Sequence, residues 1–198
     1  MIFRVFLLML LVFASLPANA ASPVKARTLS GVGVVSIPAL NTTESVPLYR
    51  EPGVGQLQEL SLSALPSLRF SGTFVDRLYF PVMAKKRGWL KVVIDDSERT
   101  GWLEMRRGWE FSRWERFLAN RPVTMLKGIR KDYYQLRKDA AGTADFLGSV
   151  EKSGALVCRE IKGEWAMLES GNGVSGWLRW RDENGRLLLQ ADVNSSLP

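Results

Sequence analysis

The side chains that most often do chemistry in proteins are scarce in this sequence. It contains no histidine and a single cysteine, Cys158. The missing histidine excludes Ser-His-Asp and Cys-His catalysis and any metal site with a histidine ligand. Cys158 therefore has no imidazole base to activate it as a nucleophile, and it has no partner for an internal disulfide. Its neighbours Leu156 and Val157 indicate a strand, where a lone cysteine packs as a small hydrophobic residue.

Two other groups of residues fit a chemical motif only in part. Ser149 and Lys152 match Ser-x-x-Lys, but the companion motifs of penicillin-recognising enzymes are absent. Asp95, Asp96 and Glu98 lie in one polar turn, whereas glycoside hydrolysis needs two carboxylates that face each other across a cleft. We interpret this turn as solvated, with a loose calcium site as the alternative. We therefore expect a protein that is not an enzyme and that uses no cofactor or metal.

Tryptophan is the residue with the clearest spacing. The stretches GWLKVVIDDSERTGWLEM (88–105) and GEWAMLESGNGVSGWLRW (163–180) each contain a tryptophan, an alternating segment, a polar turn with glycine, and Gly-Trp-Leu. An alternation of period two on both sides of a polar turn predicts a β-hairpin with one buried face. The side chains expected to face inward are Leu90, Val92, Ile94, Leu103 and Met105 in the first hairpin, and Ala166, Leu168, Leu178 and Trp180 in the second.

The residues around the second hairpin carry a resemblance to a known family. Leu136-Arg137 is followed by a polar loop, FLGSV, KSGALV, GEWAML and GWLRW. This order resembles the bacterial SH3-like domain family over about Tyr133–Leu189. The match is looser over Val32–Met105, where PLYREPG and the hairpin carry it. The resemblance implies a small β-barrel in each half of the chain and, in that family, recognition of peptidoglycan, its peptide stems or an envelope protein.

The expected architecture is mainly β: two SH3-like small β-barrels joined by a short helix, after a cleaved N-terminal signal peptide. The helix is expected because Trp109, Trp114, Phe117 and Leu118 can line one of its sides. The expected divisions are a signal peptide at 1–20, a first barrel at 30–106 with an insertion at about 57–67, a linking helix at 107–122, a second barrel at 123–190 and a tail at 191–198.

The first twenty residues have the pattern of a secretory signal. Arg4 precedes an apolar run from Val5 to about Leu16, and Ala18 and Ala20 form an Ala-x-Ala ending. A membrane anchor is the alternative, but the run is shorter than the roughly 20 residues that span a bilayer. We expect cleavage after Ala20, a periplasmic or secreted protein, and no transmembrane segment in the mature form.

Positive charge is concentrated in the middle of the chain. The segment Lys85–Lys131 holds thirteen Lys or Arg and six Asp or Glu, a local excess of seven. Such a field attracts anionic wall polymers, lipid headgroups or an acidic protein, and nucleic acid is not expected as a partner of an exported protein. Ordinary solvated surface charge is the other interpretation. The basic surface is expected to include Lys85, Lys86, Arg87, Arg106 and Arg107.

The alternation also predicts a candidate binding surface. If the aliphatic side chains face inward, the tryptophans of Gly-Trp-Leu and those at the hairpin starts project from the opposite face. Flat indoles suit sugar rings or proline-rich peptide, although small barrels also use tryptophans to cap an open end or to receive a helix. Tyrosines beside the first strands would border the groove. The predicted ligand-binding residues are Trp89, Trp102, Trp165, Trp177, Tyr49, Tyr133 and Tyr134.

The leading hypothesis is therefore an exported, non-enzymatic binding module. It would recognise peptidoglycan, a cell-wall peptide or an envelope protein through its barrels. The alternative is a protein-interaction adaptor or accessory subunit whose basic surface engages an acidic partner or a membrane.

Overall fold

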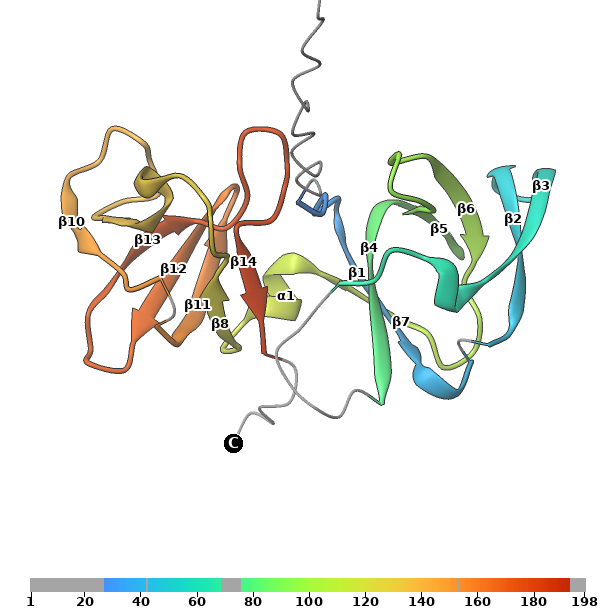
Figure 1. Cartoon of the computed structure of the whole chain (residues 1–198), viewed down its shortest axis with the longest axis horizontal. Helices are drawn as coiled ribbons and strands as arrows, with labels where there is room; N and C mark the ends of the chain where they lie inside the picture. The colour runs from blue at the N-terminus through green and yellow to red at the C-terminus, as the bar shows by residue number, and fades with distance from the viewer. Residues whose placement is uncertain (1–26, 42, 69–75, 153, 193–198) are drawn as a thin grey trace, which may run out of the picture.

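The computed structural model describes residues 27–41, 43–68, 76–152 and 154–192. The predicted signal peptide and the last six residues of the predicted tail lie outside the described residues. The described chain is mainly β, with one short α-helix and three 3-10 helices. Two antiparallel sheets lie at opposite ends of the long axis, each built from one half of the chain (Figure 1). No described segment forms a helix with the length and hydrophobicity that a membrane span needs.

The first sheet has the strand order β3-β2-β6-β5-β4-β1-β7. The 3-10 helices η1 (Ala39–Asn41) and η2 (Leu62–Ala64) follow β1 and β3, so η2 and the end of β3 occupy the segment predicted as an insertion. The strands of this sheet are β1 (Gly33–Pro38), β2 (Ser45–Glu51), β3 (Val54–Ser61), β4 (Arg77–Lys86), β5 (Trp89–Val93), β6 (Thr100–Glu104) and β7 (Glu110–Arg113).

The second sheet repeats this order strand for strand, as β10-β9-β13-β12-β11-β8-β14. The 3-10 helix η3 (Lys131–Tyr134) leads directly into β9. The strands are β8 (Pro122–Met125), β9 (Gln135–Arg137), β10 (Phe146–Ser149), β11 (Leu156–Lys162), β12 (Trp165–Ser170), β13 (Ser175–Arg179) and β14 (Leu189–Ala191). The duplication predicted from the two hairpins therefore extends over seven strands in each half.

The strand pairing among the described residues does not close either sheet into the predicted barrel. Within the described residues, no ladder joins β3 to β7 or β10 to β14, so each sheet keeps two edge strands. In the first sheet, residues 54–59 of β3 are exposed on both faces, because the β2–β3 hairpin extends beyond the core (Figure 1). The edge strand β3 therefore does not pair with the opposite edge strand, β7.

Each sheet encloses its own hydrophobic core, as the alternation predicted. Leu90, Val92 and Leu103 are buried in the first core, with Ile94 and Met105 packed against it. The second core contains all four side chains predicted to point inward in the second hairpin, Ala166, Leu168, Leu178 and Trp180. The predicted facing of the aliphatic residues is therefore confirmed in both copies.

The glycine of each Gly-Trp-Leu motif is explained by close packing against the neighbouring strand. A Cβ atom at Gly101 would lie 2.4 Å from Cδ1 of Leu48, and one at Gly176 would lie 3.1 Å from Cβ of Leu136. Both leucines are core residues of the strand beside the motif, β2 or β9. Only glycine lets that strand approach so closely, so the motif marks equivalent contacts in the two sheets.

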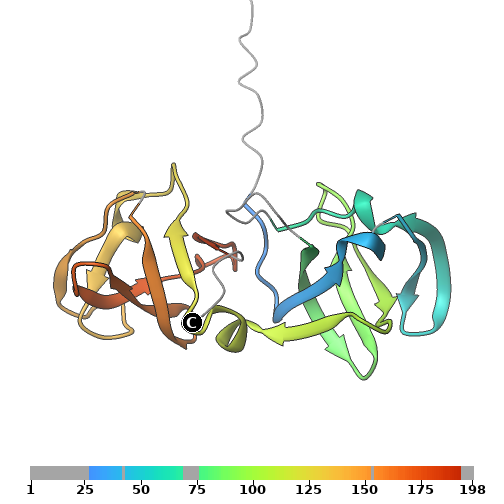
Figure 2. The same cartoon turned by 90° about the horizontal axis from the view of Figure 1, so that it is seen from below.

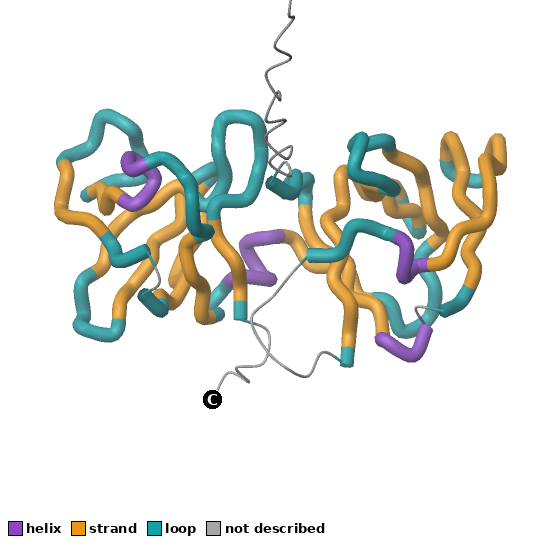
Figure 3. Tube along the Cα trace, in the orientation of Figure 1, coloured by secondary structure: helices purple, strands orange, loops and turns teal. Residues whose placement is uncertain are grey.

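The helix between the sheets is shorter than the predicted 107–122. α1 spans Trp114–Leu118, and the preceding residues 110–113 form β7, which pairs with β1. The four aromatic and aliphatic residues predicted on one helix side divide between the cores: Trp109 enters the first core, whereas Trp114, Phe117 and Leu118 enter the second. α1 lies between the two sheets in both views (Figures 2 and 3).

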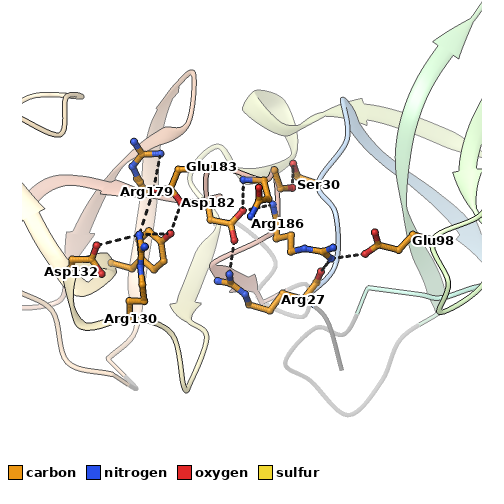
Figure 4. Close-up of polar contacts among 12 residues, drawn as sticks. Arg27, Ser30, Glu98, Arg130, Asp132, Arg179, Asp182, Glu183 and Arg186 are labelled. Atoms are coloured by element: carbon orange, nitrogen blue, oxygen red, sulfur yellow. Dashed lines mark hydrogen bonds and ion pairs between the residues drawn. The ribbon is translucent and has the colours of Figure 1, made fainter. Parts of the chain in front are cut away.

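The two sheets are also joined by polar contacts at the start of the described chain. Ser30 N donates to Gly185 O at 2.8 Å, and Trp114 Nε1 donates to Ser30 O at 2.8 Å. Asp182 is buried and forms an ion pair with Arg27 (Figure 4). Because these contacts join one sheet to the other through both backbone and charge, the halves are docked rather than loosely linked.

Candidate functional site

The tryptophans of the two Gly-Trp-Leu motifs lie in the interior of their sheets. Trp102 is 7% exposed and Trp177 is 8% exposed. The prediction that they project as an exposed aromatic patch is therefore wrong. Each lies on a strand with neighbours on both sides: Trp102 pairs with Tyr49 and Lys91, and Trp177 pairs with Arg137 and Met167. Directly opposite side chains on the same face of a sheet lie close together, so neighbouring strands on both sides limit the exposure of these indoles.

The tryptophans at the hairpin starts are half-buried and differ in their surroundings. Trp89 meets Tyr49 edge to face, with ring centroids 5.2 Å apart. Trp165 instead has the guanidinium of Arg179 over its ring at 5.0 Å from the centroid. The backbone registers are equivalent, since Trp89 pairs with Glu104 and Trp165 pairs with Arg179. One tryptophan is thus packed by a second aromatic ring, and the other by a cation.

The two adjacent tyrosines of η3 have different roles. Both are 5% exposed. The Tyr134 hydroxyl donates to Leu126 O at 2.7 Å, so this side chain is tied into the fold and does not border a groove. The Tyr133 hydroxyl donates to Glu183 Oε2 at 2.6 Å, at the rim of a cavity. Tyr133, one of the two predicted groove residues in η3, therefore lines a cavity.

That cavity is the Trp165 cleft, which has a volume of about 210 Å³. It lies at the β9 side of the second sheet and is open to solvent, and it combines aromatic rings with charges of both signs. Its lining consists of Asp132, Tyr133, Gln135, Arg137, Gly142, Trp165, Arg179 and Glu183.

A network of charges organises the rim of the cleft (Figure 4). The Arg130 guanidinium stacks on the Tyr133 ring at 4.4 Å and lies 3.3 Å from Asp132 Oδ2 and 3.4 Å from Glu183 Oε1. Arg179 Nη1 lies 2.7 Å from Glu164 Oε2 and 3.9 Å from Glu183 Oε1. These pairs fix the positions of the aromatic rings more than they stabilise the fold, because exposed ion pairs contribute little free energy.

The same network fixes the protonation states. The hydrogen bond from Tyr133 lowers the pKa of Glu183, and the nearby guanidiniums of Arg179 and Arg130 act in the same direction. Burial, followed by the hydrogen bond to Glu183, raises the pKa of Tyr133 to about 12. Near neutral pH the glutamate is therefore ionised and the tyrosine is neutral.

The remaining candidates for chemistry lie outside this cleft. Cys158 is fully buried in β11, and burial raises the pKa of its thiol to about 12, so it packs as a small hydrophobic residue, as predicted. Asp95 accepts hydrogen bonds from the backbone N–H groups of Ser97 and Arg99, within its own turn. Among the described residues, no group of three or more potential ligands is placed to hold a metal ion.

The predicted basic surface lies at one end of the first sheet. The hydrogen bond from Met105 N to Gly88 O, 2.7 Å long, brings the β4–β5 and β6–β7 turns side by side. Arg106 is partly neutralised by Glu44 at 3.1 Å. The five predicted residues, Lys85, Lys86, Arg87, Arg106 and Arg107, are all exposed. They form an exposed charged surface, and none of the five lines the Trp165 cleft.

Comparison with known proteins assigns no family. No family model and no curated protein matches the sequence. Among solved structures, NlpC2 from Trichomonas vaginalis is similar with a TM-score of 0.33 and 9% identity over 84% of this chain and 51% of that chain. NlpC1 from the same organism has a TM-score of 0.33 and 10% identity over 82% and 52% of the two chains. The chain thus spans about half the length of either protein.

A third similar structure is the CBD of endolysin LysPBC5, with a TM-score of 0.25 and 11% identity over 83% of this chain and 98% of that chain. Similarity at these scores does not identify the fold family of this chain or its function.

Proposed function

We propose that this chain is an exported, non-enzymatic binding module of the SH3-like type that takes a cell-wall peptide or glycan in the Trp165 cleft. The observation that carries the proposal is a solvent-open cavity lined by a half-buried tryptophan, a tyrosine and charges of both signs. Indole and phenol rings offer apolar faces to sugar rings or peptide side chains. Guanidiniums and carboxylates beside them fit the carboxylate and ammonium groups of wall peptides.

The protonation states in the cleft favour binding over catalysis. General acid–base catalysis works best with a group whose pKa lies near the operating pH. In the cleft, Glu183 has a lowered pKa and Tyr133 has a pKa of about 12, so both keep one protonation state around neutral pH. The sequence contains no histidine to supply an intermediate pKa.

The two half-buried tryptophans supply a matched test. In a pull-down with purified murein sacculi, we expect Trp165→Ala to reduce retention about tenfold, since a central aromatic anchor carries a large share of binding free energy. Trp89→Ala, at the equivalent position of the first sheet, is expected to retain binding because its ring already packs against Tyr49. Retention of both variants at the wild-type level would refute the cleft as the binding site.

The exposed basic end of the first sheet favours a second candidate function, an adaptor that engages an acidic partner or an anionic membrane surface. Attraction between exposed charges is screened over about 8 Å at physiological ionic strength. Repeating the pull-down at about 0.5 M salt therefore separates the two functions. Retention that depends on Trp165 and survives salt supports the cleft, whereas retention lost in salt and unaffected by Trp165→Ala supports the basic surface.

A further inference from the structure

Arg137 differs from the other two arginines around the Trp165 cleft in its partners. Arg130 and Arg179 are both ion-paired with carboxylates. Arg137 Nη1 instead donates to Ala144 O at 3.0 Å, and its Nη2 donates to Gln135 Oε1 at 2.9 Å. Within the described residues, no carboxylate lies within ion-pair distance of this guanidinium, so its charge is held by neutral acceptors alone.

The position of Arg137 makes this charge available to a ligand. The side chain is half-buried and lines the cavity with Trp165 and Tyr133. A guanidinium carries more N–H donors than these two acceptors use, and the planar group binds a carboxylate through two parallel hydrogen bonds. The bonds to Ala144 and Gln135 hold the group in place before a ligand arrives, which lowers the entropy cost of binding.

We propose that Arg137 is the anchor for a free carboxylate of the bound molecule, so that the cleft takes the carboxylate end of a wall peptide rather than uncharged glycan. This inference rests on the proposed function and specifies its ligand. Glu183, kept ionised at the same rim, disfavours a second negative charge close by. The peptide therefore enters with its carboxylate toward Arg137 and its apolar part against Trp165.

The first sheet explains why one anchor is expected and not two. Arg137 pairs with Trp177 in the register in which Tyr49 pairs with Trp102. A tyrosine thus stands where the second sheet has its arginine, and its ring fills the space beside Trp89. The first sheet has no cation at this position, and so the carboxylate site belongs to the second sheet.

Two matched synthetic stem peptides test the anchor, one with a free C-terminal carboxylate and one with a C-terminal amide there. Affinities are measured by NMR titration of the indole N–H signals of the mature protein. For the wild type we expect the acid to bind about tenfold more tightly than the amide, as charge-assisted hydrogen bonds require. In Arg137→Gln the preference should disappear while the affinity for the amide stays unchanged.

Two further variants control for folding and for general charge. Arg137→Lys keeps the cation and should retain part of the preference, with an unfolding midpoint near that of the wild type. Arg159→Gln removes an arginine of the same sheet that is paired with Glu169 outside the cleft, and it should keep the full preference. A preference that survives in Arg137→Gln, the absence of any preference in the wild type, or no binding of either peptide would overturn the anchor.

These outcomes are distinguishable from failure of the proposed function. If sacculus retention requires Trp165 but the wild type binds the acid and amide peptides equally, the anchor is refuted and the cleft remains the binding site. Loss of sacculus retention in the wild type refutes the proposed function itself.

Discussion

The two halves of the molecule share a framework and differ in one part of it. Strand order is identical in the two sheets, and tryptophans occupy equivalent register positions in both hairpins. In both, a glycine admits a core leucine of the neighbouring strand. The side chain that follows this leucine is Tyr49 in the first sheet and Arg137 in the second.

This difference decides what each sheet offers to a ligand. Tyr49 closes the space beside Trp89 by an edge-to-face contact. Arg137 leaves a cavity beside Trp165 and places a cation in it. The comparison teaches that the framework residues maintain the fold in both halves, while the side chains around the first tryptophan of each hairpin differ: Tyr49 and Glu104 in the first sheet, Arg137 and Arg179 in the second.

The largest loss of unfolding free energy is expected at the buried tryptophans that the two halves share. Trp102→Ala and Trp177→Ala each remove a buried indole from an interior strand, which costs about 3–5 kcal/mol of unfolding free energy. Urea unfolding followed by circular dichroism measures the loss. Trp165→Ala serves as the control, because this half-buried side chain should cost clearly less. A loss below about 1 kcal/mol for either buried tryptophan would contradict the shared structural role.

The sequence predicted the hairpins because alternation reports which face a side chain occupies. Leu90, Val92 and Leu178 are buried as this pattern requires. It does not report whether the opposite face is covered. In β6, three successive residues, Gly101, Trp102 and Leu103, are all buried, since strands on both sides and a curved sheet enclose both faces. Local periodicity therefore cannot predict that Trp102 is buried.

The cleft was predictable only in part for a related reason. Trp165 and Tyr133 stand out by residue type, but Glu183 reaches Tyr133 from fifty residues further along the chain. Arg137 was visible in the Leu-Arg segment, yet nothing nearby in sequence indicates that its charge lacks an acidic partner. Such a site depends on contacts made by the fold, and one sequence carries no local signal for them.

A smaller loss of unfolding free energy is expected at Gly101 and Gly176, the glycines of the two Gly-Trp-Leu motifs. In Gly101→Ala the new methyl group would lie 2.4 Å from Cδ1 of the buried Leu48, whereas in Gly176→Ala the nearest contact is 3.1 Å. We expect a loss of about 1–3 kcal/mol at Gly101 and a smaller loss at Gly176, since overpacking must displace a core side chain. Urea unfolding of both variants measures the difference.

Gly88→Ala is the matched control for the glycine pair, because a Cβ atom there meets nothing within 4 Å. Equal losses at Gly101 and Gly176, or a loss at Gly88 as large as that at Gly101, would show that backbone conformation rather than close packing explains the motif.

The smallest effect concerns the ionisation of Tyr133 at the rim of the Trp165 cleft. Burial and the hydrogen bond to Glu183 raise the pKa of Tyr133 to about 12 from the ordinary value of 10.0. The folded state therefore holds this proton more tightly than the unfolded chain does. The resulting contribution to stability is fully present below pH 10 and is lost as the pH rises from 10 toward 12.

Tyr133→Phe removes both the proton and the hydrogen bond to Glu183. The difference between the ultraviolet titrations of wild type and Tyr133→Phe should show one phenol that ionises near pH 12. Urea unfolding at pH values between 10 and 12 should show wild-type stability falling toward that of the variant. A difference titration centred near pH 10 would mean that Tyr133 does not form its hydrogen bond to Glu183. The Glu183 carboxylate would then not be held in place at the rim of the Trp165 cleft.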